Sequence, residues 1–213
     1  GSEGQMVLVC KGRAADDTSR FVTLDGRVMG GRELHEFMTD ETALETAYCG
    51  GEINRMFLVE RRIRQSEALG SVCGDTLCSV RLVTLCRENG SIDVLGAVFK
   101  LAPSGSGVDN LHAGGMSVGI DMLSGELLGG RTQADMWRPY RSELSDGTRF
   151  KGLKLPYWNQ VVSLGREAAA AFPSAKCIGW DIAIGEIGPV LIVGNWGWAL
   201  DLMQIGMRRG MMT

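Results

Sequence analysis

Two short apolar segments near the C-terminus constrain this chain most, because each carries one polar residue at a defined position. The segments span residues 179–184 and 188–195 and contain Asp181 and Asn195. Side chains alternate between the two faces of a strand, so a hairpin joined through residues 185–189 sets Asp181 opposite Val193, which shares its face with Asn195. Hard cations such as Mg2+ prefer oxygen ligands of this kind. The hairpin therefore predicts a metal site on Asp181 and Asn195, with a valine where a second carboxylate is expected.

Four segments upstream of the hairpin occur in a consistent order. They read LVERRI at 58–63, SVRLVT at 79–84, DNLHAGG at 109–115 and LPYW at 155–158. Together with the hairpin they resemble the motifs of the ATP-grasp superfamily, and within it the sugar-transfer associated ATP-grasp proteins, over roughly positions 7 to 205. The resemblance implies that ATP and Mg2+ are the cofactors.

The resemblance implies two alternative functions. The first is an ATP-dependent ligase of carboxylate–amine type that acts through an acyl-phosphate, with a small-molecule carboxylate and an amine or sugar-linked acceptor, in polysaccharide or sugar-transfer pathways. The second is a degenerate ATP-grasp domain that serves as a non-catalytic nucleotide-binding or scaffolding module. Val193 favours the second, since a valine cannot coordinate a metal, and so do Asp16 and Asp17, which would repel a triphosphate beside Lys11. The retained Lys11, Glu60, Arg81, Asp181 and Asn195 favour the first.

Strands and helices follow one another in a mixed order, which indicates an α+β fold rather than a doubly wound parallel sheet. Strands are expected at 6–10, 20–24, 27–29, 56–60, 76–86, 92–101, 116–121, 176–184 and 190–195, and helices at 31–38, 41–48, 156–172 and 199–207. The resemblance implies two α+β lobes with the nucleotide between them. Residues 5–55 would form part of the first lobe and residues 56–213 the second, with the preceding domain of such proteins absent from these 213 residues.

The resemblance also assigns roles to residues of the first half of the chain. Lys11 would reach the α- and β-phosphates, although an exposed lysine at a strand end is the simpler interpretation. Glu60 and the backbone around it would read the polar edge of adenine, or form an ordinary strand end. The ATP-binding residues expected here are Lys11, Val59, Glu60, Arg61 and Arg62, joined by Asn110 and His112 in the glycine-rich loop that follows residue 103.

Arg81 and Lys100 are the candidate catalytic residues. Arg81 lies between Val80 and Leu82, and an arginine inside an apolar strand needs a charged partner or a site. The resemblance places this arginine where charge develops as a carboxyl group is phosphorylated. Lys100 stands where an arginine is common in the family, and it keeps the charge but loses the bidentate geometry.

Charge and hydropathy exclude some classes of partner. The formal net charge is −3, which disfavours a nucleic-acid partner. No run approaches the ~18 apolar residues that a membrane span needs, so we expect no membrane span and a cytoplasmic location. Six cysteines without a CxxC pair are expected to be buried free thiols rather than zinc ligands. The sequence leaves the oligomeric state open.

Overall fold

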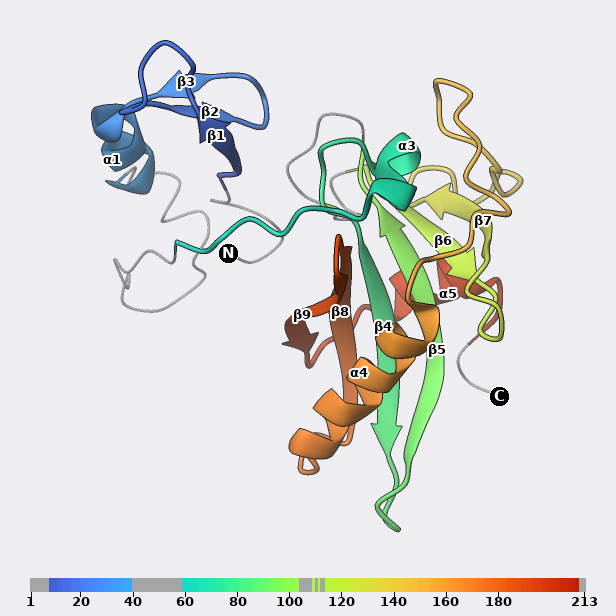
Figure 1. Cartoon of the computed structure of the whole chain (residues 1–213). Helices are drawn as coiled ribbons and strands as arrows, with labels where there is room; N and C mark the ends of the chain where they lie inside the picture. The colour runs from blue at the N-terminus through green and yellow to red at the C-terminus, as the bar shows by residue number, and fades with distance from the viewer. Residues whose placement is uncertain (1–7, 40–58, 104–108, 110, 112–113, 211–213) are drawn as a thin grey trace.

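The structure is a computed structural model that describes residues 8–39, 59–103, 109, 111 and 114–210. It contains two antiparallel sheets, one of three strands in the order β1-β2-β3 and one of six strands in the order β7-β6-β5-β4-β8-β9. Figure 1 shows the small sheet with its helix to one side of the large sheet. The expected α+β class is confirmed.

The small sheet is formed by the first described residues. Its elements are β1 (Cys10–Arg13), β2 (Phe21–Thr23), β3 (Val28–Met29) and α1 (Gly31–Thr39). The turn between β2 and β3 contains Gly26 at φ +86°, a conformation that glycine adopts without strain. The hairpin and the helix predicted here are confirmed, whereas β1 begins at Cys10, so that Lys11 lies inside the strand rather than at its end.

The large sheet carries the rest of the chain. Its strands are β4 (Ser79–Cys86), β5 (Ile92–Leu101), β6 (Met116–Ile120), β7 (Leu127–Thr132), β8 (Cys177–Gly185) and β9 (Gly188–Asn195). Two short helical turns, η2 (Glu67–Leu69) and α3 (Gly70–Cys73), precede β4. The predicted turn between β4 and β5 is confirmed, with Gly90 at φ +83°.

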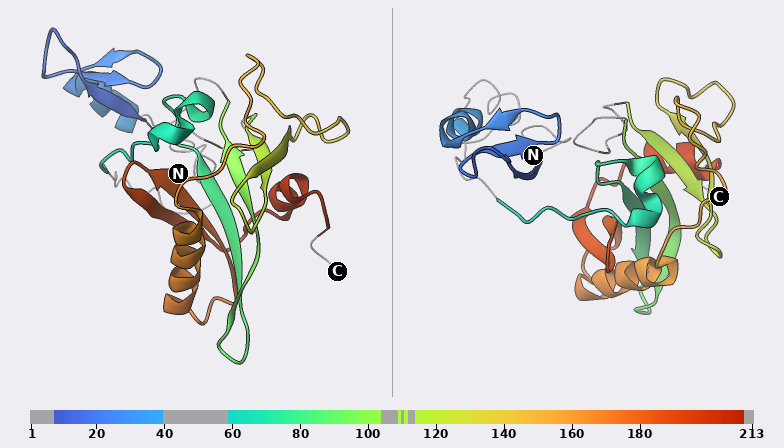
Figure 2. Two further views of the ribbon diagram at one scale, coloured as in Figure 1. Left: turned by 45° about the vertical axis from the view of Figure 1, so that its right-hand side comes forward. Right: turned by 45° about the horizontal axis from the view of Figure 1, so that its top comes forward.

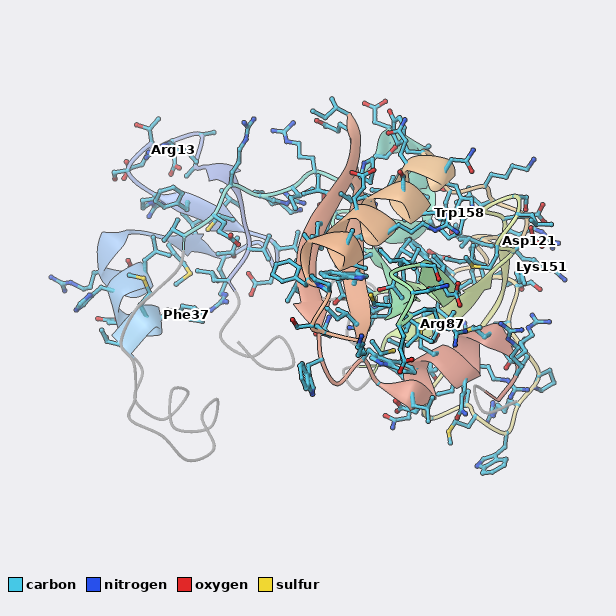
Figure 3. The ribbon with its side chains drawn as sticks, turned by 90° about the horizontal axis from the view of Figure 1, so that it is seen from below. Arg13, Phe37, Arg87, Asp121, Lys151 and Trp158 are labelled. Atoms are coloured by element: carbon cyan, nitrogen blue, oxygen red, sulfur yellow. The ribbon has the colours of Figure 1, made fainter. Side chains whose placement is uncertain are left out.

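Helix α4 (Trp158–Ala171) contacts β4, β5, β8 and β9 of the large sheet, and α5 (Leu200–Met207) contacts β5, β6 and β7. They lie on opposite faces of it, as the two views of Figure 2 show. Alternate residues of β4 divide between these faces, with Val80 and Leu82 in the core under α4 and Val83 in the cluster under α5. Trp158 begins α4 in the large unit, while Arg13 and Phe37 belong to the small one (Figure 3).

The strand predicted at 56–60 and the start of the helix predicted at 156 differ from the structure. Val59 and Glu60 lie in irregular chain rather than in a strand, and α4 begins at Trp158 instead of Pro156 because Tyr157 takes a left-handed φ of 56°. The helix expected at 41–48 and residues 56–58 lie outside the described residues.

Strand β7 was not predicted, because Gly129 and Gly130 weaken its sequence pattern. A side chain at residue 130 would come within 2.5 Å of Met116 Sδ, so glycine permits the close pairing of β7 with β6. Among the described helices none is long and apolar enough to cross a membrane.

Candidate functional site

Strand register gathers four polar side chains on the α5 face of the large sheet. Arg81 on β4 pairs with Asp181 on β8, and Ser79 on β4 pairs with Lys100 on β5. Each is at most 8% exposed, which is unusual for charged side chains unless they are paired. The sheet therefore brings together Arg81, Lys100 and Asp181, three residues that the sequence singled out separately.

Asp181 is the centre of this charged cluster. Its Oδ1 accepts a hydrogen bond from Arg81 Nε at 2.5 Å, and its Oδ2 accepts from Arg81 Nη2 at 3.0 Å and from Lys100 Nζ at 3.1 Å. The remaining Arg81 nitrogen, Nη1, donates to the carbonyl of Trp198 at 2.9 Å. A bidentate arginine pair of this kind fixes both orientation and charge.

The environment of Asp181 keeps it ionised. Burial by itself would raise the pKa of this carboxyl group, but the hydrogen bond and charge of Arg81 together with the charge of Lys100 outweigh burial and hold its pKa below the usual range. The two cations therefore have a permanent negative partner at neutral pH.

A second carboxylate, Asp109, closes the cluster from the loop after β5. Its Oδ1 accepts from Lys100 Nζ at 2.9 Å, and its Oδ2 accepts from the backbone N–H and the hydroxyl of Ser79 at 2.8 and 2.6 Å. Both oxygens are thus engaged with the start of β4 and the end of β5. The cluster contains two cations and two carboxylates and is electrically balanced.

The hairpin of β8 and β9 has the register expected from the sequence. Asp181 pairs with Val193 and Gly179 with Asn195, beside a bulge between residues 181 and 182. Asn195 Nδ2 lies 3.4 Å from Asp181 Oδ2 and 3.2 Å from the Gly179 carbonyl. Val193 is 44% exposed, so it is not a core residue.

A family model described as sugar-transfer associated ATP-grasp matches residues 1–213 of this chain. The chain belongs to the sugar-transfer associated ATP-grasp family. Membership of this ATP-grasp family implies an ATP-dependent function of the ATP-grasp type and ATP binding, usually with Mg2+. No curated protein and no solved structure matches the chain.

Asp181 and Asn195, the metal ligands expected for an ATP-grasp protein, do not fit a divalent ion as they are arranged here. A metal at its usual ~2.1 Å from Asp181 Oδ2 would lie no more than about 5 Å from Lys100 Nζ. At an effective dielectric constant of about 20, this separation corresponds to a repulsion of roughly 6–7 kcal/mol before any bound phosphate is counted. Freeing Asp181 from Arg81 would leave a buried guanidinium without its partner, at a cost of about 3–5 kcal/mol.

The facing strand β9 adds no anionic donor beside Asp181. Val193 has no donor atom, and the Asn195 side chain directs its amide toward Asp181 and Gly179. The described residues contain no group of three or more His, Cys, Asp or Glu side chains arranged to hold a metal ion.

Lys11 contacts the large unit at a residue that sequence reasoning missed. Its ammonium pairs with the carboxylate of Asp75, and Arg62 Nη2 donates to the carbonyl of the same residue at 2.5 Å. These contacts hold the pKa of Asp75 below its usual value, chiefly through the hydrogen bond from Lys11. Asp75 precedes Ser79 by four residues, so the chain cannot extend more than about 14 Å between them. Lys11 therefore approaches the end of β4 that carries the charged cluster.

The remaining expected ATP-binding residues are not drawn into the cluster. Val59 is 87% exposed, and Glu60 and Arg61 are exposed in irregular chain. Asn110 and His112 lie outside the described residues. A shallow hollow of about 690 Å3 lies at β3 and α1, and none of its lining residues belongs to the charged cluster. The exposed residues 59–61 and the hollow at β3 and α1 are therefore separate from the charged cluster.

Asp109 could be found from the sequence as the first residue of the DNLHAGG segment, although its partners could not. No local pattern marks Asp75, and the SVRLVT segment that begins at Ser79 does not name its partner, because the contacts of these two residues lie 64 and 30 positions away. Each of these two residues is defined by a contact between distant segments.

Proposed function

We propose that this chain binds an adenine nucleotide and acts as a non-catalytic nucleotide-binding or scaffolding module of the ATP-grasp type. The phosphates would face Arg81 and Lys100 on the α5 face of the large sheet. The adenine would lie against residues 59–62, and Lys11 would reach the phosphates from the small sheet. The observation that supports this function best is the buried pair of cations that share Asp181.

The cations keep donors for an anion. The described hydrogen bonds use three of the five N–H groups of Arg81 and two of the three of Lys100. Phosphate oxygens are strong acceptors and form their shortest bonds to such charged donors. Lys11 is 38% exposed at its side chain, so exchanging Asp75 for a phosphate does not require opening a core.

The acidic segment after Lys11 is less repulsive than its sequence suggests. Arg20 Nη2 lies 3.4 Å from Asp16 Oδ2, and Arg20 Nε lies 3.8 Å from Asp17 Oδ2. One guanidinium therefore offsets part of the charge of both carboxylates. Arg13 stacks over the ring of Phe21, with its guanidinium carbon 5.0 Å from the ring centroid. Nucleotide binding is therefore compatible with this segment.

Two observations favour a non-catalytic role over turnover. Asp181 is committed to Arg81 and Lys100, and Val193 occupies the position opposite it where an anionic ligand is expected. ATP-grasp transfer depends on neutralising the charge on the γ-phosphate as it moves. The module would hold the nucleotide without accelerating transfer.

The retained Arg81 supports a second candidate, the ATP-dependent ligase of carboxylate–amine type. In that reaction a carboxylate oxygen attacks the γ-phosphorus, the bond to the β-phosphate oxygen breaks and ADP leaves. An amine then attacks the acyl-phosphate carbon, phosphate leaves and the amine loses a proton. A fixed guanidinium near the transferred group would stabilise its charge. Sugar-linked or polysaccharide precursors are the acceptors in this case.

Calorimetry with a non-hydrolysable ATP analogue tests the nucleotide site. We expect saturable binding by the wild type and weakening of about tenfold in Lys11→Ala, which loses a charge-assisted phosphate contact. Lys151→Ala is the matched control, since Lys151 is exposed in a turn of the large unit and makes none of the contacts at Asp75 (Figure 3). Equal affinities of all three proteins for the analogue would show that Lys11 does not contact the nucleotide. Release of ADP from ATP by the wild type would favour the ligase.

A further inference from the structure

We infer that nucleotide binding to this chain is independent of divalent metal, because Arg81 and Lys100 take the place that metal ions would occupy beside the phosphates. The inference rests on the proposed nucleotide site and specifies how its charge is balanced. Asp181 then acts as a positioning residue that holds two cations, rather than as a metal ligand.

Both carboxylates of the charged cluster are already saturated. Asp181 accepts three hydrogen bonds from cationic nitrogens, and Asp109 accepts one from Lys100 and two from Ser79. A metal ion needs lone pairs that are directed toward it. Neither carboxylate offers them without releasing a cation or the first residue of β4.

In the part of the chain that the structure describes, the other carboxylate of the hairpin is too far from Asp181 to replace them. Glu186 is exposed in the turn between β8 and β9, five residues beyond Asp181, which corresponds to roughly 16 Å along a strand. Val193, directly opposite Asp181, contributes only methyl groups. The donor set that distinguishes a metal-dependent site is therefore incomplete at the position where it is needed.

Packing fixes the two cations in place. A side chain at residue 179 would approach Arg81 Cδ to 2.9 Å and Trp198 Cβ to 2.3 Å, so Gly179 leaves the space in which Arg81 lies against the chain before α5. Arg81 is also tied to the Trp198 carbonyl, and Lys100 bridges two carboxylates from different elements. Such preorganised cations need little rearrangement to receive an anion.

The test is calorimetric titration of the wild-type chain with ATP in excess EDTA and in excess MgCl2. We expect dissociation constants that agree within about threefold, a difference of less than about 0.7 kcal/mol. Tightening by about tenfold or more in MgCl2 would overturn the inference and leave the nucleotide site standing. Absence of binding in both buffers would overturn the nucleotide site and the inference together.

A variant of Lys100 provides an independent readout. Lys100→Gln should weaken ATP binding in EDTA by about tenfold, since one charged phosphate donor becomes a neutral one. Lys151→Gln is the control and should match the wild type. Tryptophan fluorescence would reveal an unfolded Lys100→Gln variant. In that case the comparison of wild-type ATP affinity in EDTA and in MgCl2 still tests the inference. Unchanged affinity in a folded Lys100→Gln would contradict the role of this cation.

Discussion

Replacing Asp181 with asparagine should destabilise the fold far more than the loss of an ordinary ion pair. The substitution removes the negative charge that Arg81 and Lys100 share. Lys100 keeps its ion pair with Asp109, and Arg81 keeps its hydrogen bond to the Trp198 carbonyl. The new amide nitrogen is a donor and must face one of two groups that only donate. The Asp181 side chain is 10% exposed, so water cannot replace the lost hydrogen bonds at this position. Breaking a buried pair in this way costs about 3–5 kcal/mol.

The matched control is Asp93→Asn at the far end of β4 and β5. Asp93 also pairs with an arginine Nε, that of Arg87, at 2.7 Å, but the two side chains are 54% and 46% exposed. Exposed pairs contribute about 1 kcal/mol or less. Figure 3 shows Arg87, which the sequence places at the β4–β5 hairpin. The two substitutions therefore make the same chemical change at a buried and at an exposed site.

Urea unfolding at pH 7, followed by tryptophan fluorescence, measures both variants. Trp158 and Trp180 are 6% and 3% exposed and report on the core under α4. We expect Asp181→Asn to lose about 3–5 kcal/mol of unfolding free energy, or roughly 6–20 °C in Tm for a chain of this size, and Asp93→Asn to lose about 1 kcal/mol or less. Equal losses in the two variants would refute the view that the charged cluster is a buried, mutually dependent network.

Two further predictions concern the same face of the sheet. Val193→Glu should make ATP binding dependent on Mg2+, unlike in the wild type, because it supplies a carboxylate opposite Asp181 at a half-exposed position. Val193→Gln is the uncharged control. Equal Mg2+ dependence of ATP binding in the two variants would contradict the prediction. The folded-state pKa of Asp181 is depressed, so its stabilisation is present above the unfolded pKa of about 4 and is lost as the pH falls through the lower folded pKa. The difference in unfolding free energy between the wild type and Asp181→Asn should therefore shrink below pH ~4 in urea titrations. A difference that stays constant with pH would contradict a depressed pKa of Asp181 in the folded state.

In the structure, the residues that suggested a metal site take part in ion pairs or hydrogen bonds within the protein. Asp181 and Asn195 occupy the positions that suggested a metal site, yet Asp181 is engaged with Arg81 and Lys100. The residue types permit either a cation from solution or cations from the protein as partners. Which partner is present depends on side chains carried by neighbouring strands.

The sequence by itself determined the elements whose signals are local. The hairpin of β8 and β9 follows from alternation and from its glycine-bounded turn, and its register sets Asp181 against Val193 as expected. The turn at Gly90 and helix α5 likewise rest on residues close together in the chain. Membership of the ATP-grasp family was also recognisable from ordered short motifs.

Only the tertiary structure decided what the polar residues do. Arg81 and Asp181 are 100 residues apart and Lys11 and Asp75 are 64 apart, so no local pattern specifies either pair. Strand β7 exists because Gly130 lets Met116 approach, a packing condition that a periodicity search cannot detect. The charges of this site are set by pairing between distant strands, since a buried charge requires a partner that the local sequence does not name.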